Sequence, residues 1–417
     1  METRSWWQKL KTNSLARFAV VVLIIFYMAA IFADFVAPYG PTDSQPSGSL
    51  LPPTQIYWRA VETGEFIGPH VYPTIRGPIN VNTGAQLIEA DYSRPAPLRL
   101  FMQGDEYRLF AFTLPVIQRW TLDGEIEIKK YEIFKGIPGN LHLYGVADVT
   151  PDSSGVESRV ESRVESGAVE DPSLSEAVAI APAYINIFGT DNAARDVFSR
   201  LVHGGRISLS IGLIGIAISF PLGLLVGGIS GYFGGAIDAV LMRLVEVIMT
   251  IPSIYLLVAL GVLLPAELES SERFLMIVLI VSFVGWAGLA RVIRGEVLSI
   301  KERTFVQASQ SMGARSLHII TRHILPQTAT YVIITATLAV PGYIISEAVL
   351  SLIGLGIQEP DPSWGNMLSA GTNASVLILY PWLVWPPAVL IIITVLSFNL
   401  LGDGLRDALD PRSLEGR

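Results

Sequence analysis

The chain has 417 residues, of which 51% are hydrophobic and only 16% charged, and its formal net charge is −8. So few charged side chains cannot cover a soluble protein of this length, and the negative charge leaves no basic footprint for nucleic acid. The absence of cysteine excludes disulfides, thiol nucleophiles, cysteine zinc sites and iron–sulfur clusters. The composition therefore predicts an integral membrane protein.

The first apolar run is Phe18–Phe35, and four basic residues precede it: Arg4, Lys9, Lys11 and Arg17. A helix needs about 20 mainly apolar residues to cross a bilayer core, so this run predicts a first transmembrane helix. The alternative is a cleaved signal peptide. The length of the run and the poor cleavage sequence after it favour the transmembrane helix.

Hydrophobicity then stops and does not resume until Ile207. Several segments of the intervening insert alternate or are rich in β-branched and aromatic residues, with turn residues between them: Leu98–Met102, Tyr107–Phe112, Glu125–Phe134 and Leu141–Val146. This pattern predicts a small β-rich domain. A four-residue repeat at Val156–Ser166 follows and is typical of a solvated linker.

Five more apolar runs follow, at Ile207–Phe233, Ile237–Leu264, Phe274–Val292, Thr328–Ile353 and Tyr380–Leu401. They are too long for the short alternating strands of a membrane β-barrel. The expected fold is an all-α polytopic membrane protein with six transmembrane helices and a β-rich extracytoplasmic insert between helices 1 and 2. The expected domains are 1–39 (cytoplasmic N-terminus and helix 1), 40–188 (insert and linker) and 189–417 (five-helix core).

The orientation follows from the loops. The loop between spans four and five carries six Lys or Arg residues, whereas Pro265–Arg273 is mostly acidic and Gly354–Ala370 has neither Lys nor Arg. The positive-inside rule then places that loop and both termini in the cytoplasm and the insert outside an inner (plasma) membrane. Trp364, Trp382 and Trp385 are expected at the outer interface.

The sequence lacks three common motifs of nucleotide-binding and catalytic sites. It contains no Gly-Lys dipeptide for a P-loop, no H-E-x-x-H zinc motif and no Gly-x-Ser-x-Gly nucleophile elbow. The glycine-rich stretch Gly227–Gly235 follows an apolar span, so it indicates close helix packing and then a turn at the membrane face. We therefore expect no catalytic residue, no metal site and no cofactor, and a protein that is not an enzyme.

One carboxylate lies deep inside the fifth run. Glu347 would cost about 2.5–3.5 kcal/mol there on insertion scales, so it is expected to face a cavity or a partner. Together with Ser346 it is a candidate for the translocation pathway. The alternative is a structural hydrogen bond between helices.

The loop between spans four and five has a pattern of its own at Phe305–Pro326. It predicts two short amphipathic helices hinged at Gly313, the first with Phe305, Ala308 and Met312 on one face and the second with Leu317, Ile320 and Ile324. Pro326 suits the first turn of the next helix. A plain pair of interfacial helices is the alternative.

This loop resembles the EAA coupling motif of ABC importer permeases. Ala308, Gly313, Leu325 and Pro326 match the motif, whereas Gln307, Ser309 and His323 depart from it. Three further blocks, which begin at Phe188, Glu347 and Phe398, look like the dipeptide/oligopeptide/nickel branch of these permeases. The chain most resembles the C-type oligopeptide permeases, with an enlarged first extracytoplasmic loop.

The resemblance implies an importer permease subunit in the lipid membrane, with no nucleotide site of its own. A second homologous permease would complete the path, two cytoplasmic ABC ATPases would supply the energy, and an extracytoplasmic solute-binding protein would deliver a peptide. The ATPase-coupling loop would be 293–327, with Gln307, Ala308, Ser309, Met312, Gly313, Ala314, Leu317, Ile324, Leu325 and Pro326.

Three alternatives stay open. The same architecture could import nickel or another chelate. A secondary transporter would normally have several buried ionisable groups and an internal repeat, neither of which the sequence contains. A membrane-tethered receptor or enzyme would have little use for five spans after the insert.

Overall fold

The computed structural model describes residues 10–46, 48–79, 86–120, 126–147, 182–265 and 268–409. The repeat at 156–166, expected to be a linker, lies outside these residues.

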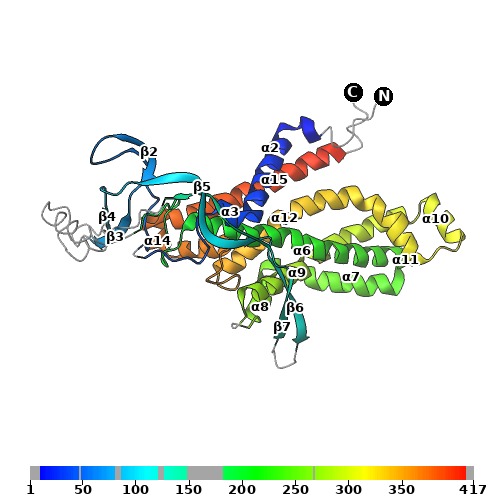
Figure 1. Cartoon of the computed structure of the whole chain (residues 1–417). Helices are drawn as coiled ribbons and strands as arrows, with labels where there is room; N and C mark the ends of the chain where they lie inside the picture. The colour runs from blue at the N-terminus through cyan, green and yellow to red at the C-terminus, as the bar shows by residue number, and fades with distance from the viewer. Residues whose placement is uncertain are drawn as a thin grey trace.

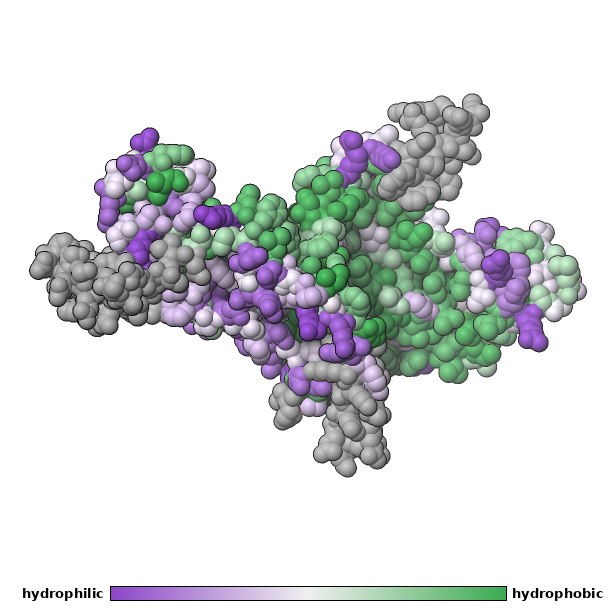
Figure 2. All heavy atoms as spheres, viewed as in Figure 1, coloured by the Kyte–Doolittle hydropathy of each residue, from purple (hydrophilic) through white to green (hydrophobic). Residues whose placement is uncertain are grey.

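Long helices form the body of the protein (Figure 1). Within the described residues, five are long and apolar enough to cross a membrane: α2 (Ser14–Ile31), α6 (Val197–Phe233), α9 (Ser270–Ile300), the continuous segment Ser316–Leu352 that contains α12 (Ala329–Leu352), and Pro381–Leu409 with α15 (Trp385–Leu409). Hydrophobic side chains cover much of the outside of this body (Figure 2). The predicted helical membrane protein is thereby confirmed at this level.

The expected third span is broken. Instead of one helix over Ile237–Leu264, the structure has α7 (Gly235–Thr250) and α8 (Ser253–Val262), bent by 85° relative to each other. Pro252 explains the break: it has no N–H to donate, and it disfavours helical geometry at Ile251, whose backbone is extended. The expected six spans are reached only if this bent pair counts as one. Figure 1 places α8 near the start of α9, at the end of the body away from α10.

Glycines let α6 and α9 approach closely. An added Cβ would lie 2.5 Å from the carbonyl oxygen of Ala290 at Gly227, and 2.8 Å from that of Arg294 at Gly231. Helix α6 then ends at Gly234, whose φ of +67° starts a turn. The glycine-rich stretch therefore packs helices and turns the chain, as the sequence predicts.

In the part of the insert that the structure describes, the strands are β1 (Tyr57–Arg59), β2 (Phe66–Val71), β3 (Thr74–Ile79), β4 (Gln86–Ala90), β5 (Ala96–Leu109), β6 (Phe112–Trp120), β7 (Ile126–Phe134) and β8 (Ile137–Val146). An antiparallel sheet has the order β1-β2-β5-β8, and β3–β4 and β6–β7 form two hairpins. Strand β5 pairs with β8, and β6 pairs with β7. The two pairs follow one another along the chain as one bent two-stranded ribbon. The β-rich prediction is confirmed for this small sheet and its hairpins.

The loop after α12 folds back onto the helices. It contains α13 (Trp364–Leu368), η4 (Ser369–Thr372), α14 (Ala374–Leu379) and η5 (Pro381–Leu383). Trp364 is only 2% exposed, and its indole N–H donates to the carbonyl of Leu201 at 2.9 Å. Trp364 thus lies inside the helical body, because α13 packs against α6 and α12, and its depth relative to the outer membrane interface stays a prediction.

The start of α2 and the end of α15 lie side by side (Figure 1). Leu10 and Ala16 form a small buried cluster with Ala408, and an added Cβ on Gly404 would lie 2.5 Å from the Cβ of Ala16. Helices α2 and α15 therefore bring Leu10 and Ala408 to one side of the helical body.

Candidate functional site: the α9–α12 loop and the buried Glu347

The α9–α12 loop is built from short helical pieces. Helix α10 covers Thr304–Ser311, and α11 (Ser316–Ile319) runs on into the π-helical turn η2 (Ile320–Ile324) and the 3₁₀ turn η3 (Leu325–Thr328). The first predicted helix is thus present. The second is a short helical start that continues into α12, with Pro326 near the beginning of η3 as expected.

Gly313 is the hinge between the two pieces. Its φ is +78°, a left-handed conformation that glycine adopts without steric cost. Its N–H donates to the carbonyl of Gln310 at 2.9 Å, and the N–H of Ala314 donates to Ser309 at 3.2 Å, which closes α10. The predicted hinge is present at this residue.

Helix α10 is fixed by its inner face. Val306 and Ser309 are buried, and Val306 packs in a cluster with Ile300 at the end of α9. The Gln310 amide donates to the Tyr232 hydroxyl of α6 at 3.2 Å. Because α10 is anchored to two membrane helices, a force on the loop would act on both.

The exposed side of α10 carries apolar side chains among polar ones. Phe305, Ala308 and Met312 are all exposed, Met312 to 81%, and the neighbouring Leu317 is 61% exposed. Leu317 was expected to share a face with Ile320 and Ile324. That expectation is wrong, because both isoleucines are buried. Leu317 lies in the four-residue α11, before the π-helical turn that contains both isoleucines.

The other predicted loop residues differ in their exposure to solvent. Gln307 is exposed and its amide donates to the carbonyl of Glu302, and Pro326 is also exposed. Ala314 and Leu325 are half-buried. Ile324 is fully buried, in the same cluster as Val306. Phe305, Ala308, Met312 and Leu317 are the exposed apolar residues among those predicted for this loop, and we call them the loop surface.

Glu347 lies in a different place, fully buried in the helical body. Its carboxylate accepts hydrogen bonds from the hydroxyls of Ser351 (2.7 Å) and Ser208 (3.3 Å). The same two hydroxyls accept the backbone N–H groups of Ile357 and Trp364, both at 3.0 Å. The carboxylate thus connects α6, α12 and the folded-back loop. Ser346 is half-buried, and its hydroxyl donates to the carbonyl of Gly342 (2.7 Å).

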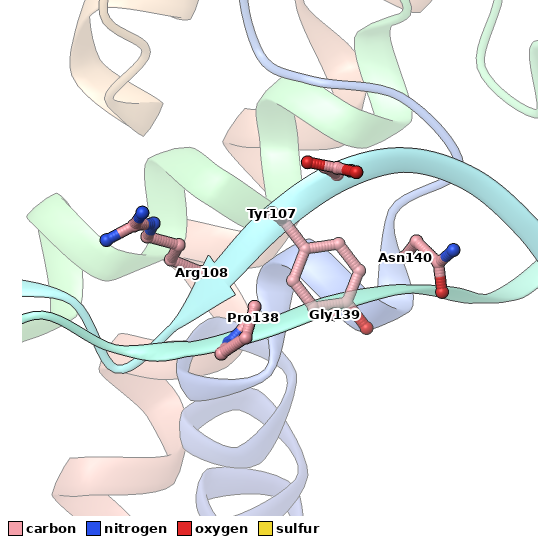
Figure 3. A pocket seen from close by; sticks show the side chains of 6 residues that line it. Tyr107, Arg108, Pro138, Gly139 and Asn140 are labelled. Atoms are coloured by element: carbon pink, nitrogen blue, oxygen red, sulfur yellow. The ribbon is translucent and has the colours of Figure 1, made fainter.

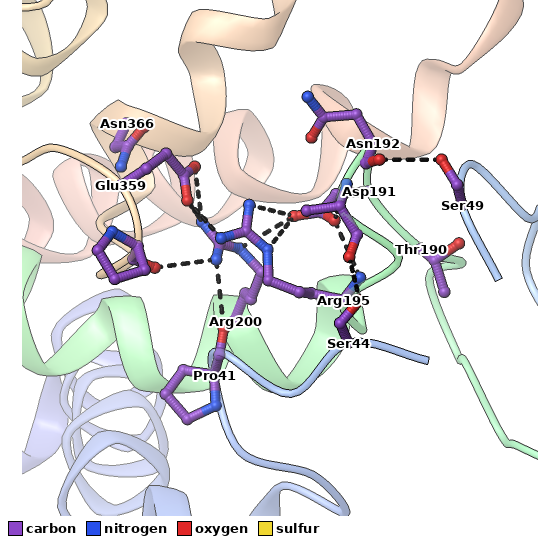
Figure 4. Close-up of polar contacts among 12 residues, drawn as sticks. Pro41, Ser44, Ser49, Thr190, Asp191, Asn192, Arg195, Arg200, Glu359 and Asn366 are labelled. Carbon is purple, nitrogen blue, oxygen red and sulfur yellow. Dashed lines mark hydrogen bonds and ion pairs between the residues drawn. The ribbon is translucent and has the colours of Figure 1, made fainter. Parts of the chain in front are cut away.

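Sequence reasoning missed an ion-pair network near the start of α6 (Figure 4). The guanidinium of Arg200 donates to Glu359 at 2.9 Å and to the carbonyls of Pro41 and Pro360 at 3.2 and 3.1 Å. Arg195 pairs with the same Glu359 and with Asp191. The only sequence signal was the charge density of the block that begins at Phe188. The network ties the segment before α6 to the loop after α12.

A cavity of 410 Å³ lies beside this network, lined among others by Arg200, Glu359, Asn366 and Tyr380.

A second ion pair lies just past the end of α2, in the short helix α3 (Ala33–Val36). Burial alone would raise the pKa of Asp34, but hydrogen bonds from His203 and Arg206 outweigh it and hold that pKa at about 2. Asp34 therefore stays charged and fastens α3 to α6.

Comparison with known proteins identifies the family. The family model described as "Binding-protein-dependent transport system inner membrane component" matches residues 220–415, and "N-terminal TM domain of oligopeptide transport permease C" matches residues 3–53. The dipeptide transport system permease protein DppC of Bacillus subtilis is 41% identical over 56% of this chain and 71% of its own length. The chain belongs to this permease family.

Other relatives agree. The oligopeptide transport system permease proteins OppC of Bacillus subtilis and Escherichia coli are each 40% identical, over 55% and 54% of this chain and 73% and 72% of their own lengths. Among solved structures, the MetNI methionine ABC transporter in inward facing conformations is similar over 51% of this chain and 97% of the matched chain, with 20% identity and a TM-score of 0.38. The family membership confirms the resemblance predicted from the sequence.

Proposed function

We propose that this chain is a permease subunit of an ATP-driven importer and forms, with a second related permease, the membrane path for peptides. The names of the relatives, dipeptide and oligopeptide permeases, support peptides over nickel or another chelate. An extracytoplasmic binding protein delivers the peptide, and the chain itself is not an enzyme, because partner ATPases hydrolyse the ATP.

The loop surface is the observation that carries this proposal. Exposed apolar side chains that gather at one place mark a surface that another protein covers. Here Phe305, Met312 and Leu317 project from a loop whose inner face is buried against α6 and α9. An ATPase subunit that binds the loop surface can therefore move these helices. We assign the coupling role to residues 293–327.

The topology that fits this role has six spans, with α7 and α8 together forming the third. The loop and both termini then lie in the cytoplasm, and the insert lies outside. The three domains are 1–39, 40–188 and 189–417. The packing of Leu10 against Ala408 supports placing the two termini on one side.

Glu347 keeps two interpretations. A pathway role for Glu347 and Ser346 stays a prediction. The hydrogen bonds of Glu347 to Ser208 and Ser351 support the structural alternative, in which the carboxylate braces three segments.

The test is peptide uptake by the complete importer reconstituted in liposomes, with ATP on the ATPase side. Met312→Asp places a charge on the loop surface without disturbing the buried face. We expect this variant to assemble poorly with the ATPases and to lose most peptide uptake and most stimulation of ATP hydrolysis by loaded binding protein.

Thr12→Asp adds the same charge at an exposed position before α2, outside residues 293–327 and on the same proposed side of the membrane, and serves as the matched control. Uptake by Met312→Asp equal to that of this control would contradict the coupling role. Uptake of metal chelates but not of peptides by the parent would contradict the proposed substrate.

A further inference from the structure

The β-ribbon of the insert is fastened to the chain just beyond α2. His142 of β8 is buried, and its Nδ1 is hydrogen-bonded to the carbonyl of Ala37 at 2.7 Å. Both long strands contact α3. Figure 3 shows β5 and β8 running beside the helix at the N-terminal end of the chain. The ribbon therefore lies at the level where the first membrane span ends.

Two phenylalanines of the ribbon contact this end of α2, and both have an unusual backbone conformation. Phe101 and Phe110 have φ values of 56° and 61°, a left-handed conformation that is costly for a bulky side chain. The ring of Phe110 meets Phe32 edge-on at 5.5 Å, and that of Phe101 stacks on Phe35 at 6.3 Å. The two strained positions are thus the ones that hold the ribbon against the end of the span.

The ribbon bends where β5 passes into β6 and β7 into β8, and the bend combines apolar and basic side chains. Phe134 is 50% exposed, Ile137 is 54% exposed, and Phe110 is also exposed. Arg108 and Lys135 are exposed beside them, and the Arg108 guanidinium donates to the carbonyl of Lys135. We call these five residues the ribbon bend.

The position of the ribbon bend indicates what covers it. The outward side chains of α2, among them Ile24, Met28 and Ile31, are exposed as expected for a helix in lipid. Through Phe32 and Phe110 this lipid-facing surface continues directly into the ribbon bend. Aromatic and basic side chains together are favoured at the headgroup level, where rings enter the apolar boundary and long cationic chains reach phosphates.

We propose that the ribbon bend inserts into the headgroup and acyl boundary of the leaflet in which α2 ends, and so holds the insert against the membrane. The occupant is lipid, because the surface is continuous with the lipid-facing side of α2. In the topology proposed above, this is the outer leaflet. The inference rests on the family's membrane location and not on the transported substrate.

The test uses single cysteines in a chain that has none. Phe134→Cys carries a fluorescent label on the full chain in nanodiscs, and quenching is compared between lipids with spin-labelled acyl chains and iodide in water. Phe66→Cys, an exposed aromatic position of β2 at a distance from α2 in Figure 1, is the matched control. We expect several-fold stronger lipid quenching at position 134 than at position 66, with the reverse order for iodide. Ile137→Cys repeats the measurement at a second position of the bend.

Equal quenching at positions 134, 137 and 66 would overturn the proposal. It would also be overturned if the bend were open to iodide in nanodiscs and became shielded only when the solute-binding protein was added, because the surface would then dock a protein. Neither readout depends on uptake, so a failure of the proposed peptide transport would leave this result intact.

Discussion

At the scale of single residues, Gly313 has a left-handed backbone conformation and open space where a side chain would lie. Nothing lies within 4 Å of the position that a Cβ would take, so a substitution is opposed by its left-handed backbone and not by a neighbour. A β-branched side chain in that conformation costs about 1–3 kcal/mol. The loop can relieve this strain only by changing the angle between α10 and α11.

Gly313→Val should therefore leave the protein inserted but alter the loop surface. We expect severe loss of uptake, and loaded binding protein should no longer stimulate ATP hydrolysis. Both are measured in reconstituted complexes, with Arg303→Gln as an exposed neighbour whose change should be mild. If Gly313→Val transports like the parent, the loop is only a pair of interfacial helices.

Glu347 can be tested by separating its charge from its shape. Glu347→Gln keeps an acceptor for one of the serine hydroxyls, so a structural brace should survive with uptake near that of the parent. Glu347→Ala leaves buried hydroxyls with one partner fewer, which costs about 1–3 kcal/mol for each unsatisfied group, and should lower the melting temperature of the purified protein. Normal assembly with lost uptake in Glu347→Gln would instead favour the pathway role.

At the scale of elements, the contact between α6 and α9 depends on the glycines of α6. A leucine at Gly227 must displace the backbone of α9, because its Cβ alone would approach the Ala290 carbonyl to 2.5 Å. Overpacking of this kind costs about 1–3 kcal/mol or more. We expect Gly227→Leu to lower the melting temperature in detergent and to reduce assembly. Gly288→Leu on α9 is the matched control, since nothing lies within 4 Å of its Cβ position, and equal melting temperatures for the two variants would contradict this account.

The elements that could be predicted from the sequence are those that a simple period or a special residue determines. Long apolar runs indicated the spans, and alternation indicated strands near β5, β7 and β8. The bend between α7 and α8 was missed because an apolar run has the same composition whether its helix is straight or bent, although Pro252 was visible within the run. The face of Leu317 was missed because the segment from Ser316 to Thr328 is not one regular α-helix but a short α-helix followed by a π-helical and a 3₁₀ turn, so a single period of 3.6 does not describe it.

At the scale of the whole molecule, contacts between distant segments were beyond the sequence. The buried position of Trp364 depends on a loop that folds back onto α6. Arg200 is hydrogen-bonded to Glu359, which lies 159 residues away in the sequence. A single sequence contains no signal for such pairings. The loop surface was partly predictable, because one helical period and one glycine determine most of it.

The proposed sidedness rests on the Lys and Arg asymmetry and on the packing of Leu10 against Ala408, and it can be tested on one set of variants. Glu62→Cys in the insert, Ser311→Cys in the α9–α12 loop and Asp407→Cys at the end of α15 all introduce thiols at exposed positions. In intact cells with a permeabilised outer envelope, an impermeant maleimide should label only position 62. Positions 311 and 407 should react together once the inner membrane is opened, because two spans separate them and, if α7 and α8 form a single span, three spans separate position 311 from position 62. Labelling of positions 311 and 407 together with 62 in intact cells would place all three on one side, and the bent pair would then not cross the membrane as one span.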